Sequence, residues 1–184
     1  MNSALGLFED SLDWLNQHYK EYRFFTERDI VWTVQVHLMD AIANSLPSHQ
    51  VHCNYPVLAD QCKCLADVAV LDNTDTVPLA AEFKYEPDQS RDDTLPSKSP
   101  VVLWKEGVCQ DVARGQRYGA NHAAEAVVSV FIDEGSCFRR KDPPRGVIGQ
   151  IGMTGCLCSF HEHQRHRLHG TCHPRFYRTL YDFA

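Results

Sequence analysis

The sequence predicts an α/β protein built around a mixed central sheet. Amphipathic helical patterns fill residues 5–44, and a further helical segment covers 104–118. Short apolar or alternating runs that are typical of strands cover 51–58, 65–71, 77–85 and 126–133. The order of helix, three strands, helix and strand predicts helices packed on a mixed sheet within one domain.

The N-terminal segment contains two expected helices with a clear boundary between them. Residues 5–25 repeat apolar side chains at helical spacing, which indicates a packing helix. Thr26 and Asp29 form a capping-box pattern, so a second helix should begin after Thr26 and run to about Asn44. Glu27 precedes the first apolar pair of that helix by three and four residues, which places it on the inward face.

Two of the expected strands carry charged residues in informative places. Asp67 lies within 65–71, a nearly all-apolar run that predicts a central strand buried on both faces. Residues 77–85 alternate, so Glu82 and Lys84 project from the same face. The opposite face of that strand collects the apolar side chains of Val77, Leu79, Ala81, Phe83 and Tyr85.

The composition excludes several classes of protein. The chain has 184 residues with 43% hydrophobic and 23% charged residues, as expected of a soluble globular domain. No apolar run approaches the ~20 residues that a membrane helix needs. The N-terminus lacks the basic start and apolar core of a signal peptide, so we expect a cytoplasmic protein with free thiols at its eight cysteines.

Charge is distributed unevenly along the chain. Residues 1–138 contain 10 Lys and Arg against 21 Asp and Glu, a net charge of −11, whereas 139–184 carry +5 and five histidines. The overall charge of −6 is unusual for a protein that holds nucleic acid permanently. An acidic body with a basic end still permits a local phosphate-binding surface.

The acids and the lysine on neighbouring strands indicate a metal site. A buried carboxylate such as Asp67 requires a cation or hydrogen-bond donors. If the two strands pair, Asp67, Glu82 and Lys84 converge, and a divalent cation would relieve the repulsion between the carboxylates. Hard oxygen ligands suit Mg²⁺. Lys84 could then hold or help to deprotonate a bound water, and Glu27 could complete the acidic cluster.

A structural interpretation of the same residues stays open. A Glu-x-Lys pattern on a strand is common and usually lies on a solvated face, so the pattern by itself does not identify an enzyme. Its placement favours an active site, because the aspartate lies on an apolar strand and an inward glutamate lies on the preceding helix.

These features resemble the PD-(D/E)XK nuclease superfamily. The segments AEFKYEP, PVVLW and VFIDEG, with the stretch at 107–114, resemble an uncharacterised group within it, and the resemblance covers about residues 26–140. Ala66 replaces the proline that gives the motif its first letter, a substitution common in the superfamily. The residues that carry the resemblance are Glu27, Asp67, Glu82, Phe83 and Lys84.

The resemblance implies a restriction-endonuclease-like αβββαβ core with a mixed sheet flanked by helices. It further implies that Asp67, Glu82 and the Phe83 carbonyl bind Mg²⁺, for which Mn²⁺ can substitute, that Lys84 assists the attacking water, and that Glu27 is the helix acid. Two more residues, Asp111 and Arg114, match the region where the family often places auxiliary polar groups. An i,i+3 surface ion pair is an equal alternative for those two.

The expected function is Mg²⁺-dependent hydrolysis of phosphodiester bonds, as in a DNA endonuclease. Nucleic acid, in particular DNA, is then the partner; no membrane partner is expected, and a homodimer stays open. The alternative is a nuclease-fold domain that binds nucleic acid or a protein without cutting. The intact Glu-x-Lys pattern favours the enzyme, whereas the acidic body favours the binding domain.

The C-terminal end divides the expected organisation into a nuclease-like domain at 1–146 and a tail at 147–184. The tail is rich in Cys, His and Arg without convincing periodicity. Zinc binding, disorder and a foreign, frameshifted end are the alternatives that its composition allows. Cys53, Cys62 and Cys64 could also bind zinc, but they lack the second well-spaced cysteine pair of a typical zinc site. The tail residues that could bind zinc are Cys156, Cys158, His161, His163, His166, His169, Cys172 and His173.

Overall fold

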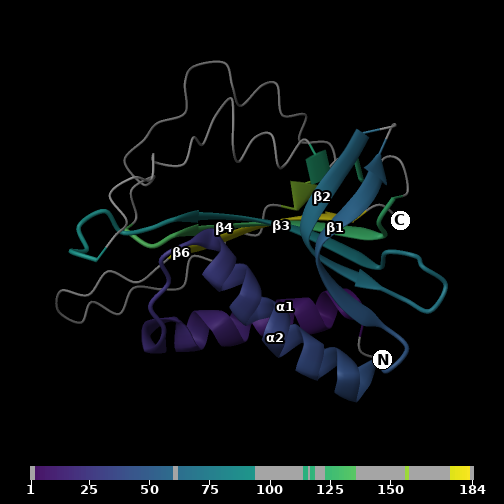
Figure 1. Ribbon diagram of the computed structural model, residues 1–184, viewed down its shortest axis with the longest axis horizontal. Helices are drawn as coiled ribbons and strands as arrows, with labels where there is room; N and C mark the ends of the chain where they lie inside the picture. Colours follow the sequence, from purple (N-terminus) through teal and green to yellow (C-terminus); the bar gives the residue numbers. More distant parts are fainter. Residues whose placement is uncertain are drawn as a thin grey trace.

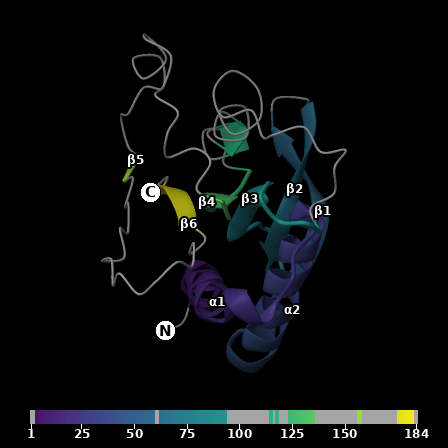
Figure 2. The same ribbon diagram turned by 90° about the vertical axis from the view of Figure 1, so that its left-hand side faces the viewer.

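The chain folds as a mixed α/β protein. The computed structural model describes residues 3–59, 62–93, 114–115, 117–118, 123–135, 156–157 and 175–182. Two helices, α1 (Ala4–His18) and α2 (Glu27–Ser45), pack against each other on one face of the sheet (Figures 1 and 2). Within the described residues, no helix is both long and apolar enough to cross a bilayer.

The predicted cap of α2 is confirmed. The Thr26 hydroxyl accepts a hydrogen bond from the Asp29 backbone N–H at 3.3 Å, and Asp29 Oδ2 accepts one from the Thr26 N–H at 2.8 Å. Each side chain satisfies a backbone donor that the first helical turn would leave unpaired. The cap therefore fixes where α2 begins, and with it the position of Glu27.

The prediction of one helix over 5–25 is wrong at its end. Helix α1 ends at His18, a short 3₁₀ turn, η1 (Tyr19–Glu21), follows, and residues 22–25 form a non-helical connector. Tyr22 turns the chain into an extended conformation with φ −111° and ψ 155°. The connector is then held by distant parts of the chain, because the Phe24 carbonyl accepts a hydrogen bond from Arg91 Nη1 at 3.1 Å and lies 3.2 Å from Tyr85 Oη.

The described strands form a mixed sheet in the order β1-β2-β3-β4-β6-β5. Strands β3 and β4 are parallel, and the other neighbouring pairs are antiparallel. Helical residues between β3 and β4 include Arg114 and Tyr118; most of the helix expected at 104–118 lies outside the described residues. The strand bounds are β1 (Gln50–Ala59), β2 (Cys62–Leu71), β3 (Leu79–Glu86), β4 (Ala126–Asp133), β5 (Cys156–Leu157) and β6 (Arg175–Asp182).

Apolar side chains on each face of the sheet form separate buried clusters. The cluster under α1 and α2 includes Leu79, Ala81, Phe83 and Tyr85 of β3, as the alternation predicts. Val77 is an exception and belongs to the cluster on the opposite face, because it precedes β3 and its carbonyl bonds the Glu125 N–H. The second cluster is Val57, Ala66, Ala69, Leu71, Val77, Ala80, Tyr118, Ala124 and Val127.

The segment 147–184 contributes to the sheet. Strand β6 pairs along β4 from Ala126↔Asp182 to Asp133↔Arg175, and β5 pairs with β6. The predicted boundary at 146 and the side chains of the tail cysteines and histidines lie outside the described residues. Part of the chain beyond that boundary is therefore a sheet element.

Candidate metal-binding site at the fork between two strands

Strands β2 and β3 separate at Asp67. Their ladder runs from Val70↔Leu79 to Val68↔Ala81 and stops there. Strand β2 continues with β1, although Asn54, which lies opposite Asp67, is in a left-handed conformation with φ 49° that locally interrupts this second ladder. Asparagine tolerates that conformation better than most residues. The β1–β2 ribbon thus leaves the sheet where the candidate site begins (Figure 1).

Carboxylates replace the missing strand partner along β3. The Phe83 backbone N–H donates to Asp67 Oδ2 at 2.7 Å. The Tyr85 backbone donates a hydrogen bond to the Glu27 carboxylate in the same way. Because buried backbone donors require partners, the fork draws Asp67 from β2 and Glu27 from α2 to one edge of β3.

The lysine lies between these groups. Lys84 Nζ donates to the Phe83 carbonyl at 3.1 Å and lies 3.6 Å from Glu27 Oε2. The side chains of Lys84 and Glu27 are 25% and 31% exposed, so both are accessible from solvent. The structure therefore brings together four predicted site residues, namely Glu27, Asp67, Phe83 and Lys84.

The environment raises the pKa of Glu27. Burial is the main cause, the charge of Asp67 adds to it, and the charge of Lys84 together with the Tyr85 hydrogen bond opposes it. A carboxyl group that retains its proton at higher pH is better suited to proton transfer near neutrality than an ordinary glutamate.

Glu82 occupies a more enclosed position. Its side chain is 3% exposed on the face of the sheet opposite α1 and α2. Glu82 Oε1 accepts a hydrogen bond from Tyr118 Oη at 2.9 Å and lies 3.6 Å from Arg114 Nη1. Burial and the charge of Glu82 raise the pKa of Tyr118, which keeps the phenol protonated as a donor. The buried carboxylate is thus matched by a cation and a hydroxyl.

The sequence identified one of these two partners of Glu82. Arg114 was predicted as auxiliary and contacts the site, whereas Asp111 lies outside the described residues. Tyr118 was missed as a site residue. Its signal was the i,i+4 spacing from Arg114, which places both side chains on one face of a helix.

The predicted metal ligands are the carboxylates of Asp67 and Glu82 and the Phe83 carbonyl, oxygen donors on two neighbouring strands. The described contacts join Asp67 to Phe83, whereas Glu82 contacts Arg114 and Tyr118. Mg²⁺ is usually held by one or two protein carboxylates, with water and phosphate oxygens completing its shell. Among the described residues, no three His, Cys, Asp or Glu side chains form a metal-binding cluster, so a site here would depend on two side chains and a backbone carbonyl.

Comparison of the chain with protein-family models, curated proteins and solved structures gave no match. Its function is therefore inferred from the fork between β2 and β3, where acids from two elements and a lysine surround an interrupted ladder.

Proposed function

We propose that this chain is a Mg²⁺-dependent phosphodiesterase that acts on nucleic acid, in particular DNA, through a restriction-endonuclease-like core. The observation that carries this proposal is the contact set at the fork, where Asp67, Phe83, Lys84 and Glu27 meet and the Lys84 and Glu27 side chains are partly exposed. In metal-assisted hydrolysis of a phosphate ester, carboxylates can hold the metal ion and a lysine can act on a phosphate oxygen or on water.

The roles follow from the position of each group. Asp67, Glu82 and the Phe83 carbonyl would hold Mg²⁺, which when bound supplies positive charge at a scissile phosphate and acidifies water. Lys84, 3.1 Å from the Phe83 carbonyl, would donate hydrogen bonds to a phosphate oxygen or to the attacking water. Glu27 would hold the Lys84 ammonium and exchange a proton with solvent.

A second candidate function is a nuclease-fold domain that binds nucleic acid or a protein without cutting. The observation that favours it is the environment of Glu82, whose side chain is 3% exposed, lies 3.6 Å from Arg114 and accepts a hydrogen bond from Tyr118. A carboxylate neutralised in this way has less need of a metal ion, which would make the same residues a structural network.

Cleavage assays on single-stranded, linear duplex, nicked and branched DNA separate these functions. With Mg²⁺, we expect the wild type to cut at least one of these substrates and Asp67→Asn to be inactive while retaining its fold. Asp40→Asn is the matched control, because Asp40 is exposed on α2. No cleavage by any of the proteins would favour the binding domain, whereas activity in Asp67→Asn equal to that of the control would show that the fork is not the active site.

A further inference from the structure

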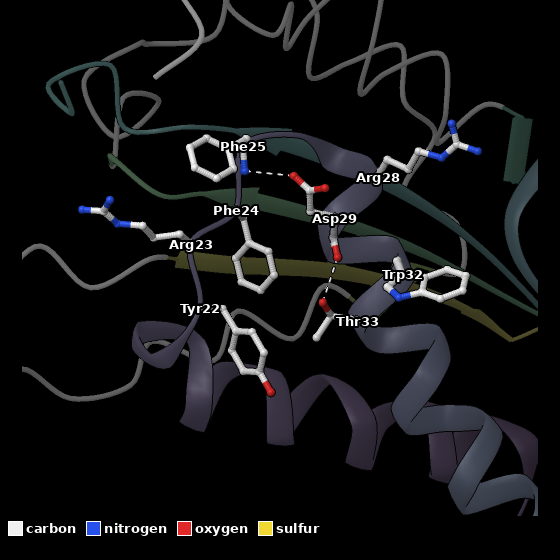
Figure 3. A pocket seen from close by; sticks show the side chains of 8 residues that line it. All are labelled: Tyr22, Arg23, Phe24, Phe25, Arg28, Asp29, Trp32 and Thr33. Atoms are coloured by element: carbon white, nitrogen blue, oxygen red, sulfur yellow. Dashed lines mark hydrogen bonds between the residues drawn. The ribbon is translucent and has the colours of Figure 1, made fainter. Parts of the chain in front are cut away.

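A hollow of about 430 Å³ lies outside the proposed catalytic site, between the α1–α2 connector and the first turns of α2 (Figure 3). Its volume is within the range of roughly 300–1,000 Å³ typical of sites for small organic groups. The residues that line it are Tyr22, Arg23, Phe24, Phe25, Arg28, Asp29, Trp32 and Thr33.

Aromatic rings dominate the walls of the hollow. Trp32 is 63% exposed, and Tyr22 and Phe25 are 41% and 38% exposed, although rings of this size are usually covered. Phe24 is buried and stacks on Tyr22 with the ring centroids 5.6 Å apart, which keeps the Tyr22 ring in place. The hollow therefore offers a held Tyr22 ring and the exposed rings of Phe25 and Trp32 to a flat ligand, with the Arg91 guanidinium 5.8 Å from the centroid of the Phe25 ring.

Positive charge flanks these rings. Figure 3 shows Arg23 and Arg28 on opposite sides of the hollow, extending away from it. The Arg23 side chain is 79% exposed and lies 3.3 Å from Asp93. The acid in the lining, Asp29, accepts hydrogen bonds from the backbone N–H groups of Phe25 and Thr26. A ligand with a flat apolar group between two anionic groups fits this arrangement, and a nucleotide within a strand has that form.

The hollow lies beside the proposed catalytic site. Phe25 and Arg28 line it, and Glu27, which lies between them in sequence, directs its carboxylate to Lys84. We propose that the hollow holds an unpaired base of single-stranded nucleic acid next to the bond to be cut. This inference rests on the proposed function, and it makes single-stranded or partly unpaired nucleic acid the substrate class.

A protein partner is the other occupant to be tested. Val36 and Met39 are 43% and 48% exposed and continue the apolar surface of α2 beyond Trp32. Neither of them lines the hollow. The two arginines that flank the aromatic rings, Arg23 and Arg28, favour nucleic acid, because phosphate contacts and base stacking act together on such a surface.

Fluorescence anisotropy with a labelled single-stranded oligothymidylate and a blunt duplex tests this proposal. In EDTA, which removes any contribution from bound metal, we expect the wild type to prefer the single strand. Trp32→Ala and Phe25→Ala should weaken that binding by about 5- to 150-fold, the range for loss of one stacked base. Met39→Ala truncates another exposed side chain of α2 and should leave the binding unchanged. Arg28→Ala should lower the slope of the logarithm of the binding constant against the logarithm of the salt concentration by about one unit.

Equal binding by Trp32→Ala and Met39→Ala, or no preference for the single strand, would overturn the proposal. So would a loss of self-association in Trp32→Ala, measured by sedimentation, without a change in oligonucleotide binding, since the hollow would then be a protein interface. Cleavage in Mg²⁺ is measured separately. Stacking-dependent binding without any cleavage would refute the phosphodiesterase and leave the hollow as a binding site.

Discussion

Glu82 and its partners show how single residues determine the candidate site. A carboxylate that is 3% exposed depends on Arg114 and Tyr118 for its stability. We expect Arg114→Met to lower the free energy of unfolding by about 1–3 kcal/mol, because the buried Glu82 carboxylate loses the neighbouring cation while the Tyr118 hydrogen bond remains. Urea denaturation measures this change. The loss should be smaller when Glu82→Gln is added, and an equal loss in both backgrounds would show that the pair is not coupled.

Glu27 predicts a pH dependence of stability. Because burial raises its pKa above the ordinary 4.5, the folded chain binds this proton more tightly than the unfolded chain. Stability from this group is therefore complete below the ordinary pKa and declines as the pH rises through the raised value.

Glu27→Gln removes this titration. Relative to the wild type, its free energy of unfolding should increase over that pH window and then level off, as measured by urea denaturation in a pH series. Asp40→Asn, with its exposed side chain, is the control. A constant difference between Glu27→Gln and the wild type at all pH values would contradict the raised pKa.

Residue types and spacing predicted much of the candidate site. The alternation of β3 placed Glu82 on the face opposite Phe83, and the inward position of Glu27 followed from the helical repeat. The sequence could not show that β2 and β3 separate at Asp67, because that depends on where the ladder ends. For the same reason, the hydrogen bond from the Phe83 N–H to Asp67 could not be foreseen.

Among the elements, the loop after β3 is anchored by a polar network. Glu134 accepts hydrogen bonds from Tyr85 Oη at 2.7 Å, the Asp88 backbone N–H at 2.9 Å and Arg91 Nη1 at 2.8 Å. Arg91 also bonds the Phe24 carbonyl, so the network joins this loop to the connector before α2. These bonds help to hold the N-terminus of α2 beside the fork.

Glu134→Ala should weaken the polar network that joins the loop after β3 to the connector before α2. The variant removes the carboxylate that accepts hydrogen bonds from the Tyr85 hydroxyl, the Asp88 N–H and Arg91, so we expect the free energy of unfolding to fall by about 1–3 kcal/mol. Hydrogen exchange of the 86–93 backbone should accelerate more than that of α1. Glu125→Ala, on an exposed residue before β4, is the control, and equal exchange in the two variants would refute this role.

The elements themselves could be predicted to different degrees. The cap of α2 could be predicted from the sequence because it is made by Thr26 and Asp29, which are three residues apart. The end of α1 could not be predicted from the sequence, since the connector after it is held by contacts of the Phe24 carbonyl with Tyr85 and Arg91, which are distant in sequence. Strand β6 has the aromatic and β-branched residues of a strand, but its pairing with β4 joins distant parts of the chain.

At the scale of the whole molecule, the sheet extends beyond residue 146. Removal of β5 and β6 would expose the edge of β4, whose residues lie in both buried clusters. An unpaired, largely apolar edge is unstable and prone to aggregation. A chain ending at Gly146 should therefore melt at a lower temperature than the full chain and aggregate more, as measured by calorimetry and light scattering. Matching melting temperatures would show that β6 does not support the sheet.

The central claim is that the fork is the active site of a Mg²⁺-dependent phosphodiesterase. Single-turnover cleavage by the wild type and Lys84→Ala, with Mg²⁺ affinity measured in parallel by calorimetry, tests it most directly. Lys20→Ala, on an exposed lysine of η1, is the control. We predict that Lys84→Ala retains Mg²⁺ binding and loses about 10²–10⁴-fold in rate, as is typical when a proton-transfer or water-positioning group is removed. Equal rates in Lys84→Ala and the wild type would contradict the account.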